Sequence, residues 1–185
     1  MTWVIDPAHS EIQFSAKHLM ISTVRGRFNA FTGTIDADEN HPTAAKVDVQ
    51  IDASSLVTGE ERRDTHLRSP DFLDVEKYPY LTFKSTRVER IDETHGKLYG
   101  DLTIRDVTKP VVLDVEYAGQ AKTPWGTLSS GFNAQTKINR KHWDLNWNVA
   151  LETGGWLVGD TITINIELEL VKQVEQPQEA DAVAA

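Results

Sequence analysis

Apolar and polar residues alternate along most of the chain, a pattern typical of strands with one buried face. The run 161–170 is the most regular, because every second residue from Ile162 to Leu170 is isoleucine or leucine. Within 24–37 the alternation changes phase at Ala30-Phe31, which predicts a bulge or bend. Further alternating runs occupy 11–17, 47–52, 80–84, 97–104, 111–119 and 127–139.

Turn-forming residues separate these runs at 39–42, 92–96, 109–110 and 124–126. The chain therefore predicts about eight antiparallel strands in simple meander order. Several of them span about 8–10 residues, which is longer than the usual strand of about 5–6. Long strands in up-and-down order favour a closed barrel over a sandwich, so the predicted fold class is all-β. An eight-stranded barrel is either filled by its own side chains or holds one small ligand.

One segment, RRDTHLRSPDFLD at 62–74, departs from the strand pattern. Thr58 and Glu61 have the spacing of a capping box, which predicts a short helix ending near Arg68. Ser69-Pro70 then predicts a second short helical turn, because proline is favoured at the first position of a helix. The segment is therefore expected to be a helical insertion between two strands.

The 185 residues suit one domain, expected over 1–172, followed by an acidic, aperiodic tail at 173–185 that is predicted to be disordered. Lys and Arg total 19 against 28 Asp and Glu, which gives a net charge of −9. Such a surface repels phosphate backbones, so a nucleic-acid partner is not expected. The chain has no cysteine, which excludes disulfides, thiolate zinc sites and cysteine nucleophiles.

The N-terminal residues MTWVIDPAHS lack the basic and apolar regions of a secretory signal. No apolar run approaches the roughly 20 residues that a membrane-spanning helix needs. We therefore expect a cytoplasmic protein without a transmembrane segment.

A catalytic reading of the helical insertion has weak geometric support. Asp64 and His66 are two residues apart on the predicted helix, so they do not face each other. The chain has no Gly-x-Ser-x-Gly motif that would supply a nucleophile. A solvent-exposed charged helix, with Asp64 and Arg68 as an i,i+4 pair, is favoured instead.

The six histidines give no metal-binding motif, because none are spaced as His-x-His or His-x-x-x-His. Convergence of His9, His18 and His66 with a carboxylate from elsewhere stays open, without support from spacing. No metal site is therefore predicted.

The segment 139–160 is rich in tryptophan, and Trp143, Leu145 and Trp147 alternate with polar residues. This pattern predicts a strand or hairpin that either completes the core or, with Trp156, forms an apolar wall or flap beside a cavity. In the second case asparagines could offer neutral hydrogen bonds to a ligand, namely Asn139, Asn146 and Asn148. Small residues on the apolar faces favour a cavity, since they leave volume unfilled: Ala16, Gly26, Ala30, Gly100, Ser130 and Ala134.

Four segments of the chain resemble the YceI-like, polyisoprenoid-binding family in their order and spacing. They are WVIDPAHSEIQFSAKHLMISTVRGRFNAFTGTI, RRDTHLRSPDFLDVEKYPYLTFKS, GDLTIRDVTKPVVLDV, and INR at 138–140 followed by VGDTITINIELEL. The resemblance spans 2–171. It implies an extended, lipocalin-like eight-stranded antiparallel barrel with a helical insertion. It also implies that the pore binds a long-chain amphiphile, such as a polyprenyl quinone or polyprenyl phosphate derivative, and it is compatible with a homodimer.

On this resemblance we expect residues 62–74 to form a cap over one end of the barrel. Its apolar residues would face the ligand or core, while its charged residues would hold the cap in place. Lys17 and His18 would lie near the headgroup. The expected ligand-binding residues are Phe14, Lys17, His18, Phe28, Arg63, Asp64, His66, Leu67, Phe72, Leu73, Phe83, Leu102, Phe132, Trp143, Trp147 and Ile164.

Three functions remain open at this point. The first is non-enzymatic carriage or storage of an isoprenoid-type amphiphile, with no cofactor other than the bound lipid. The second is an enzyme that modifies an amphiphilic lipid, using His66 or His18 with Asp64. The third is a packed structural barrel without a ligand.

Overall fold

The computed structural model describes residues 1–173, so the predicted tail lies, apart from Gln173, outside the described residues. The helical elements are α1 (Glu61–Arg68) and the short 3-10 helices η1 (Pro7–His9), η2 (Ala53–Ser55) and η3 (Arg140–Trp143). The strands are β1 (Thr2–Ile5), β2 (Glu11–His18), β3 (Ser22–Phe28), β4 (Phe31–Asp38), β5 (His41–Asp52), β6 (Leu56–Val57), β7 (Tyr80–Arg90), β8 (His95–Ile104), β9 (Val107–Lys122), β10 (Leu128–Asn139) and β11 (Thr161–Lys172).

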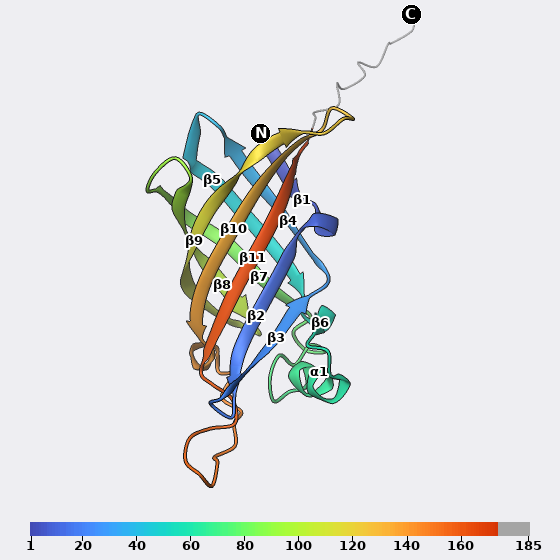
Figure 1. Ribbon diagram of the computed structural model, residues 1–185, viewed down its shortest axis with the longest axis vertical. Coiled ribbons are helices and arrows are strands. Elements are labelled where there is room, and N and C mark those ends of the chain that lie inside the picture. Colours follow the sequence, from blue (N-terminus) through green and yellow to red (C-terminus); the bar gives the residue numbers. More distant parts are fainter. Residues whose placement is uncertain (174–185) are drawn as a thin grey trace, which may run out of the picture.

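Eight strands close into an antiparallel barrel in the order β1-β4-β5-β7-β8-β9-β10-β11, with β11 pairing back to β1 (Figure 1). The last strand closes the ring where Leu170 pairs with Ile5 of β1, and farther along it also pairs with β2, through Ile164 and Phe14. The helix η1 offsets β1 from β2 between these two pairings. The predicted eight-stranded, all-β barrel with a short helical insertion is therefore confirmed.

The barrel is elongated and its two ends carry different segments (Figure 1). We call the end with the chain's N-terminus and the β9–β10 turn the terminal end. The opposite end carries α1, the β2–β3 turn and the long β10–β11 connection, and we call it the helical end. Among the described residues, no helix is long and apolar enough to cross a membrane.

The predicted break at Ala30-Phe31 is present, since β3 ends at Phe28 and β4 begins at Phe31. The turn predicted at 109–110 is wrong. Pro110 pairs with Asp101 inside the β8–β9 ladder, and the turn lies at Arg105, whose φ is 58°. Alternation continues through Val107, so the apolar pattern outweighs the Lys-Pro turn signal here.

Two of the small residues that predicted free volume are instead covered by aromatic rings. A Cβ atom on Gly26 would lie 2.3 Å from Cζ of Phe14, and one on Gly100 would lie 2.3 Å from Cζ of Phe83. Each glycine therefore makes room for a ring from the neighbouring strand rather than for a ligand. Ala30 is exposed, so it does not bear on the interior at all.

Candidate functional site

The barrel interior has two walls that differ in how completely their side chains are buried. Most inward-facing apolar residues of β1, β4, β5, β7 and the adjoining part of β8 are almost fully buried, and they include the predicted Phe83 and Leu102. Ala37 and Val47 are the partly buried exceptions on β4 and β5. On the adjacent strands β10, β11 and β2, Ile12, Ile138 and Leu170 are buried. Seven other inward-facing apolar residues of these strands are only partly buried: Phe14, Phe132, Ala134, Ile162, Ile164, Ile166 and Leu168. We call these seven residues the open wall.

The open wall indicates interior space, because side chains that point into a closed barrel can only be reached from inside. Its members come from three strands joined by the register Ile166–Ala134 and Ile164–Phe14. The surface they offer is apolar, and it is interrupted by Thr136, which is in phase with Ala134 on β10 and pairs with Ile164. Of the predicted ligand-binding residues, Phe14, Phe132 and Ile164 lie on this wall, whereas Phe28 is buried in the packed part with its ring centroid 5.5 Å from that of Phe14.

Two concavities have volumes of about 460 and 560 Å³, and Ala134 and Ile166 of the open wall line part of the first. Their linings include outward-facing charged residues, such as Asp114, Glu116 and Glu167 in the first and Lys84 and Arg87 in the second. An alkyl chain gains little from such surfaces, since apolar surface is stabilised by apolar partners. The interior is the better candidate site for an apolar ligand.

The helix α1 is anchored at the helical end by a buried carboxylate. Asp64 is buried and accepts hydrogen bonds from the backbone N–H of Thr58, at 2.9 Å, and from the Thr58 hydroxyl. Arg63 donates to the same hydroxyl at 2.7 Å and to the Thr58 carbonyl at 3.0 Å. Arg68 donates to the carbonyls of Ser54 and Leu56. These bonds tie α1 to η2, β6 and the residue that follows β6.

Several details of the predicted helix are wrong. Its N-cap is Glu60, whose carboxylate accepts from the N–H groups of Arg62 and Arg63, and Thr58 lies outside the helix. The expected Asp64–Arg68 pair does not form, because both side chains bind backbone or hydroxyl groups before the helix. Residues after Ser69 form a hydrogen-bonded turn rather than a second helix.

Aromatic rings join α1 to the β10–β11 connection, which we call the closing loop (residues 140–160). The His66 ring lies edge-on to Trp147, with centroids 4.5 Å apart, and to Phe72 at 5.1 Å. His66 Nε2 also lies 2.8 Å from a carboxylate oxygen of Asp71. Leu67 and Leu73 pack against the core from the same segment. His66 therefore has a different carboxylate partner from the Asp64 invoked by the enzymatic alternative.

The closing loop forms the predicted hairpin only at its tip, where Ala150 and Trp156 make an antiparallel bridge, and it begins with a 3-10 helix instead of a strand. Trp143 belongs to η3, and it is almost fully buried with its indole N–H donating to the carbonyl of Leu102 at 3.0 Å. Trp156 is half exposed, so it does not line the interior. Two asparagines bind the backbone, since Asn139 accepts from Lys141 N and Asn148 exchanges two bonds with Val158. The strand predicted from alternation is absent after Asn139 because a 3-10 helix begins there.

A buried arginine, Arg140 of the INR segment at 138–140, holds this loop in place, and its burial was not predicted. Arg140 is 2% exposed and donates to the carbonyls of Gly159, Leu145 and Trp147. Its Nη2 lies 3.8 Å from an Asp160 carboxylate oxygen. Burial lowers the pKa of the Arg140 guanidinium, and the Asp160 charge opposes that shift. The guanidinium thus joins the start, middle and end of the loop.

The two residues expected near a headgroup point in different directions. Lys17 is exposed, and its amine donates to the Thr23 hydroxyl at 3.1 Å on the outer face. His18 is partly buried where β2 reaches the helical end and bridges to Val158 of the closing loop. His18 therefore lies at the helical end against the closing loop, whereas the Lys17 amine lies on the outer face.

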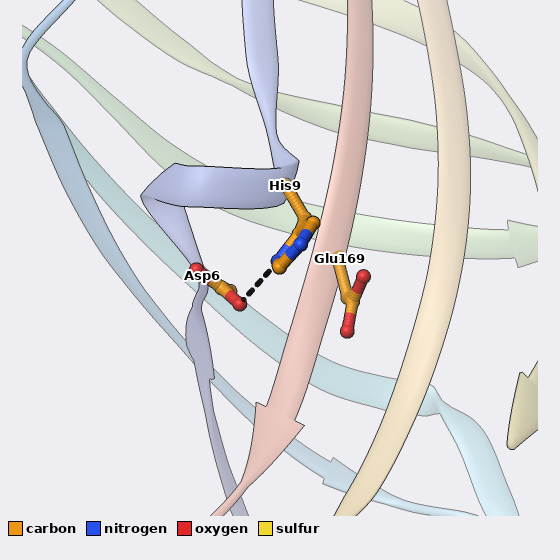
Figure 2. Close-up of side chains that lie close together, drawn as sticks. All are labelled: Asp6, His9 and Glu169. Carbon is orange, nitrogen blue, oxygen red and sulfur yellow. Dashed lines mark hydrogen bonds and ion pairs between the residues drawn. The ribbon is translucent and has the colours of Figure 1, made fainter. Parts of the chain in front are cut away.

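One group of three side chains with metal-ligating atoms converges within the described residues: Asp6, His9 and Glu169, whose ligand atoms lie within 4.8 Å of one another (Figure 2). Asp6 accepts from Ala8 N and pairs with His9 Nδ1 at 2.9 Å, which caps η1. The hydrogen bond with His9 lowers the pKa of Asp6, and the same bond raises the pKa of His9. Helix capping accounts for this arrangement, and His18 and His66 lie elsewhere.

The predicted set of ligand-binding residues left out other inward-facing residues of the partly accessible strands. Ile162, Ile166 and Leu168 continue the alternation of β11, so the pattern itself identified them. Tyr117 is likewise in phase on β9, with its ring 5.3 Å from that of Phe132. By contrast, no periodic signal points to Arg140.

The family model for the YceI-like domain matches residues 3–170. A UPF0312 protein of Pectobacterium atrosepticum is 43% identical over 165 residues, covering 89% of this chain and 82% of its own. The solved YceI protein of Campylobacter jejuni is 37% identical with a TM-score of 0.73, covering 85% of this chain and 90% of its own. A structure described as a polyisoprenoid binding domain from Saccharophagus degradans is 15% identical with a TM-score of 0.64 and coverage of 92% and 98%. On its sequence match and its barrel, this chain belongs to the YceI-like family.

Proposed function

We propose that the barrel binds one long-chain, isoprenoid-type amphiphile, such as a polyprenyl quinone or polyprenyl phosphate derivative, and carries or stores it without chemical change. The open wall is the observation that carries this proposal. It offers a largely apolar, partly accessible surface on three adjacent strands of a closed barrel. Family membership supports the proposal, as does the neighbour from Saccharophagus degradans, whose description names polyisoprenoid binding.

The energetics suit a carrier. Removing a methylene group from water is worth about 0.8 kcal/mol, so a free polyprenyl chain would bind very tightly. In a cell the competitor is a bilayer, where the chain is already out of water. The net transfer is then small, which allows both loading and release. The apolar residues of the cap, Leu67, Phe72 and Leu73, would lie over one end of the tail.

The direct test is the lipid content of the protein purified from its native host without detergent. Organic extraction and mass spectrometry should find one isoprenoid-type lipid per chain. An extract without such a lipid, or one that shows conversion of the lipid by the protein, contradicts the proposal.

A pair of substitutions on one strand tests the location. Ala134→Phe adds a ring to the open wall, whereas Gln135→Phe adds the same ring to the outer face next to it. Ala134→Phe should fill the interior and reduce the retained lipid at least about tenfold, since it competes for the same space. Gln135→Phe should retain the wild-type amount. Equal retention by the two variants, both folded by circular dichroism, would place the lipid elsewhere.

A further inference from the structure

Two neighbouring turns at the helical end expose large apolar side chains. Leu19, Met20 and Ile21 of the β2–β3 turn are 37%, 57% and 81% exposed, and Val149 and Trp156 of the closing loop are 46% and 50% exposed. We call these five residues the apolar tip. Single exposed apolar residues are ordinary on protein surfaces, but a contiguous group of them marks an interaction site.

The two turns form one surface. Leu19 N donates to the Leu157 carbonyl at 2.9 Å, and Gly159 N donates to the Lys17 carbonyl at 2.9 Å. A Cβ atom on Gly155 would lie 3.4 Å from Cγ of Met20, so the turns are in contact. Figure 1 shows both segments projecting together from the helical end of the barrel.

The β2–β3 turn has apolar residues where its backbone favours others. Leu19 and Met20 have φ values of 54° and 63°, and Ile21 N donates to the His18 carbonyl at 3.1 Å. A β-turn with positive φ at both central residues, as over 18–21 here, is normally made of Asn or Gly at those positions, because bulky residues are strained there. A turn shaped by folding alone would not carry Leu-Met. The strain indicates that these side chains serve another purpose at this position.

The tip also lacks charge. Residues 19–24 contain no charged side chain, and residues 145–158 contain only Glu152, whereas a quarter of the whole chain is charged. An uncharged, protruding surface with a tryptophan matches the interfacial zone of a bilayer, where tryptophan is enriched. A stable protein partner needs about 800 Å² from each side, which two narrow turns do not provide.

We propose that the apolar tip inserts into the interface of a phospholipid bilayer and docks the barrel with its helical end against the membrane. The net charge of −9 disfavours contact between the rest of the surface and anionic headgroups, so apolar insertion rather than charge attraction drives the docking. Docking stands on the tip alone. Its purpose, exchange of the interior lipid with the membrane, rests on the proposed function.

The sharpest variant is Leu19→Asn with Met20→Gly, which places Asn-Gly in the strained turn. This double variant should weaken binding to phosphatidylcholine vesicles, measured by co-sedimentation, by about tenfold or more, because two inserted apolar side chains are lost. Its melting temperature should equal or exceed that of the wild type, because the turn is relieved of strain. Loss of binding therefore cannot be attributed to loss of fold.

Trp125→Ala is the matched control, because Trp125 is 87% exposed in the β9–β10 turn of the terminal end. It should bind vesicles like the wild type. The proposal is overturned if wild-type protein does not sediment with vesicles, if the double variant binds equally well, or if Trp125→Ala loses as much binding. It is also overturned if light scattering shows a dimer that the double variant abolishes, since the tip would then bind a second copy.

The outcomes also separate docking from the proposed function. Lipid in the extract without vesicle binding would refute docking and leave the interior site standing. Vesicle binding by a protein whose extract holds no lipid would support docking and refute the interior lipid site.

Discussion

The side-chain hydrogen bonds that close the turns at the two ends of the barrel differ in range. At the terminal end the turns are closed by nearby side chains, as where Asp38 accepts from Asn40 N and Asp92 accepts from Thr94 N and His95 N. At the helical end the bonds span longer stretches of chain, 41 residues from Trp143 to Leu102 and 19 from Arg140 to Gly159. The β4–β5 and β7–β8 turns are thus closed locally, although Lys172 of β11 also pairs with Glu39 across 133 residues. The closing loop, in contrast, depends on tertiary contacts.

The largest loss of stability is expected from Arg140→Ala, which removes tertiary contacts at the helical end. The substitution leaves three backbone carbonyls without their donor, and each unsatisfied buried group costs about 1–3 kcal/mol. The free energy of unfolding should fall by about 3 kcal/mol, because some carbonyls will find water. Urea denaturation followed by circular dichroism measures the loss.

Lys141→Ala is the control for this change, because Lys141 is the exposed neighbour and pairs with the same Asp160 at 3.2 Å. An exposed ion pair contributes about 0–1 kcal/mol. If the two substitutions cost the same, the buried guanidinium does not organise the closing loop.

A smaller and more local effect is expected from Asp64→Ala. The buried carboxylate accepts two bonds from Thr58, so its removal should cost about 1–3 kcal/mol, mostly by freeing α1 from the barrel. Trypsin should then cleave faster at Arg62 and Arg63, which measures local opening of the helix.

Asp71→Ala removes a more exposed carboxylate from the same segment, one that pairs with His66. It should leave the trypsin cleavage rate within about twofold of the wild type, as expected for an exposed pair. If trypsin cleaves the Asp64→Ala variant no faster than the wild type, the Thr58 contacts do not anchor the cap.

Sequence reasoning succeeded where structure is local. The alternation of β11 and the turn at 92–96 are read from adjacent residues, and both elements are present. It failed at the start of the closing loop, where Trp143 and Leu145 alternate like strand residues, although Trp143 ends a 3-10 helix and Leu145 lies just after it. That helix is stabilised by Arg140 and by the Leu102 carbonyl, and neither contact produces a periodic pattern in the sequence.

The same limit applies to the candidate site. Phe14 and Ile164 were predicted from alternation, and both lie on the open wall. Phe83 was predicted by the same signal but packs over Gly100 in the filled wall. Alternation shows which side chains point inward. It does not show which wall is filled, because that depends on how rings from neighbouring strands fit together.

The smallest effect is expected at the terminal end and concerns pH. Backbone N–H groups of Thr94 and His95 hold the pKa of Asp92 at about 2, below its ordinary 3.8. A carboxyl group whose pKa is lowered by folding stabilises the fold above pH 3.8, and this contribution is lost as the pH falls toward 2. Asn at this position keeps an oxygen that accepts the same bonds but cannot become charged.

The melting temperature of the wild type should therefore exceed that of Asp92→Asn above about pH 4, and the difference should vanish as the pH falls toward 2. The difference isolates Asp92, since every other carboxylate titrates in both proteins. Glu93→Gln changes the adjacent exposed carboxylate and serves as the control. A difference that persists unchanged at pH 2 would show that the charge of Asp92 does not hold this turn. The turn would then depend on tertiary contacts, as the helical end does.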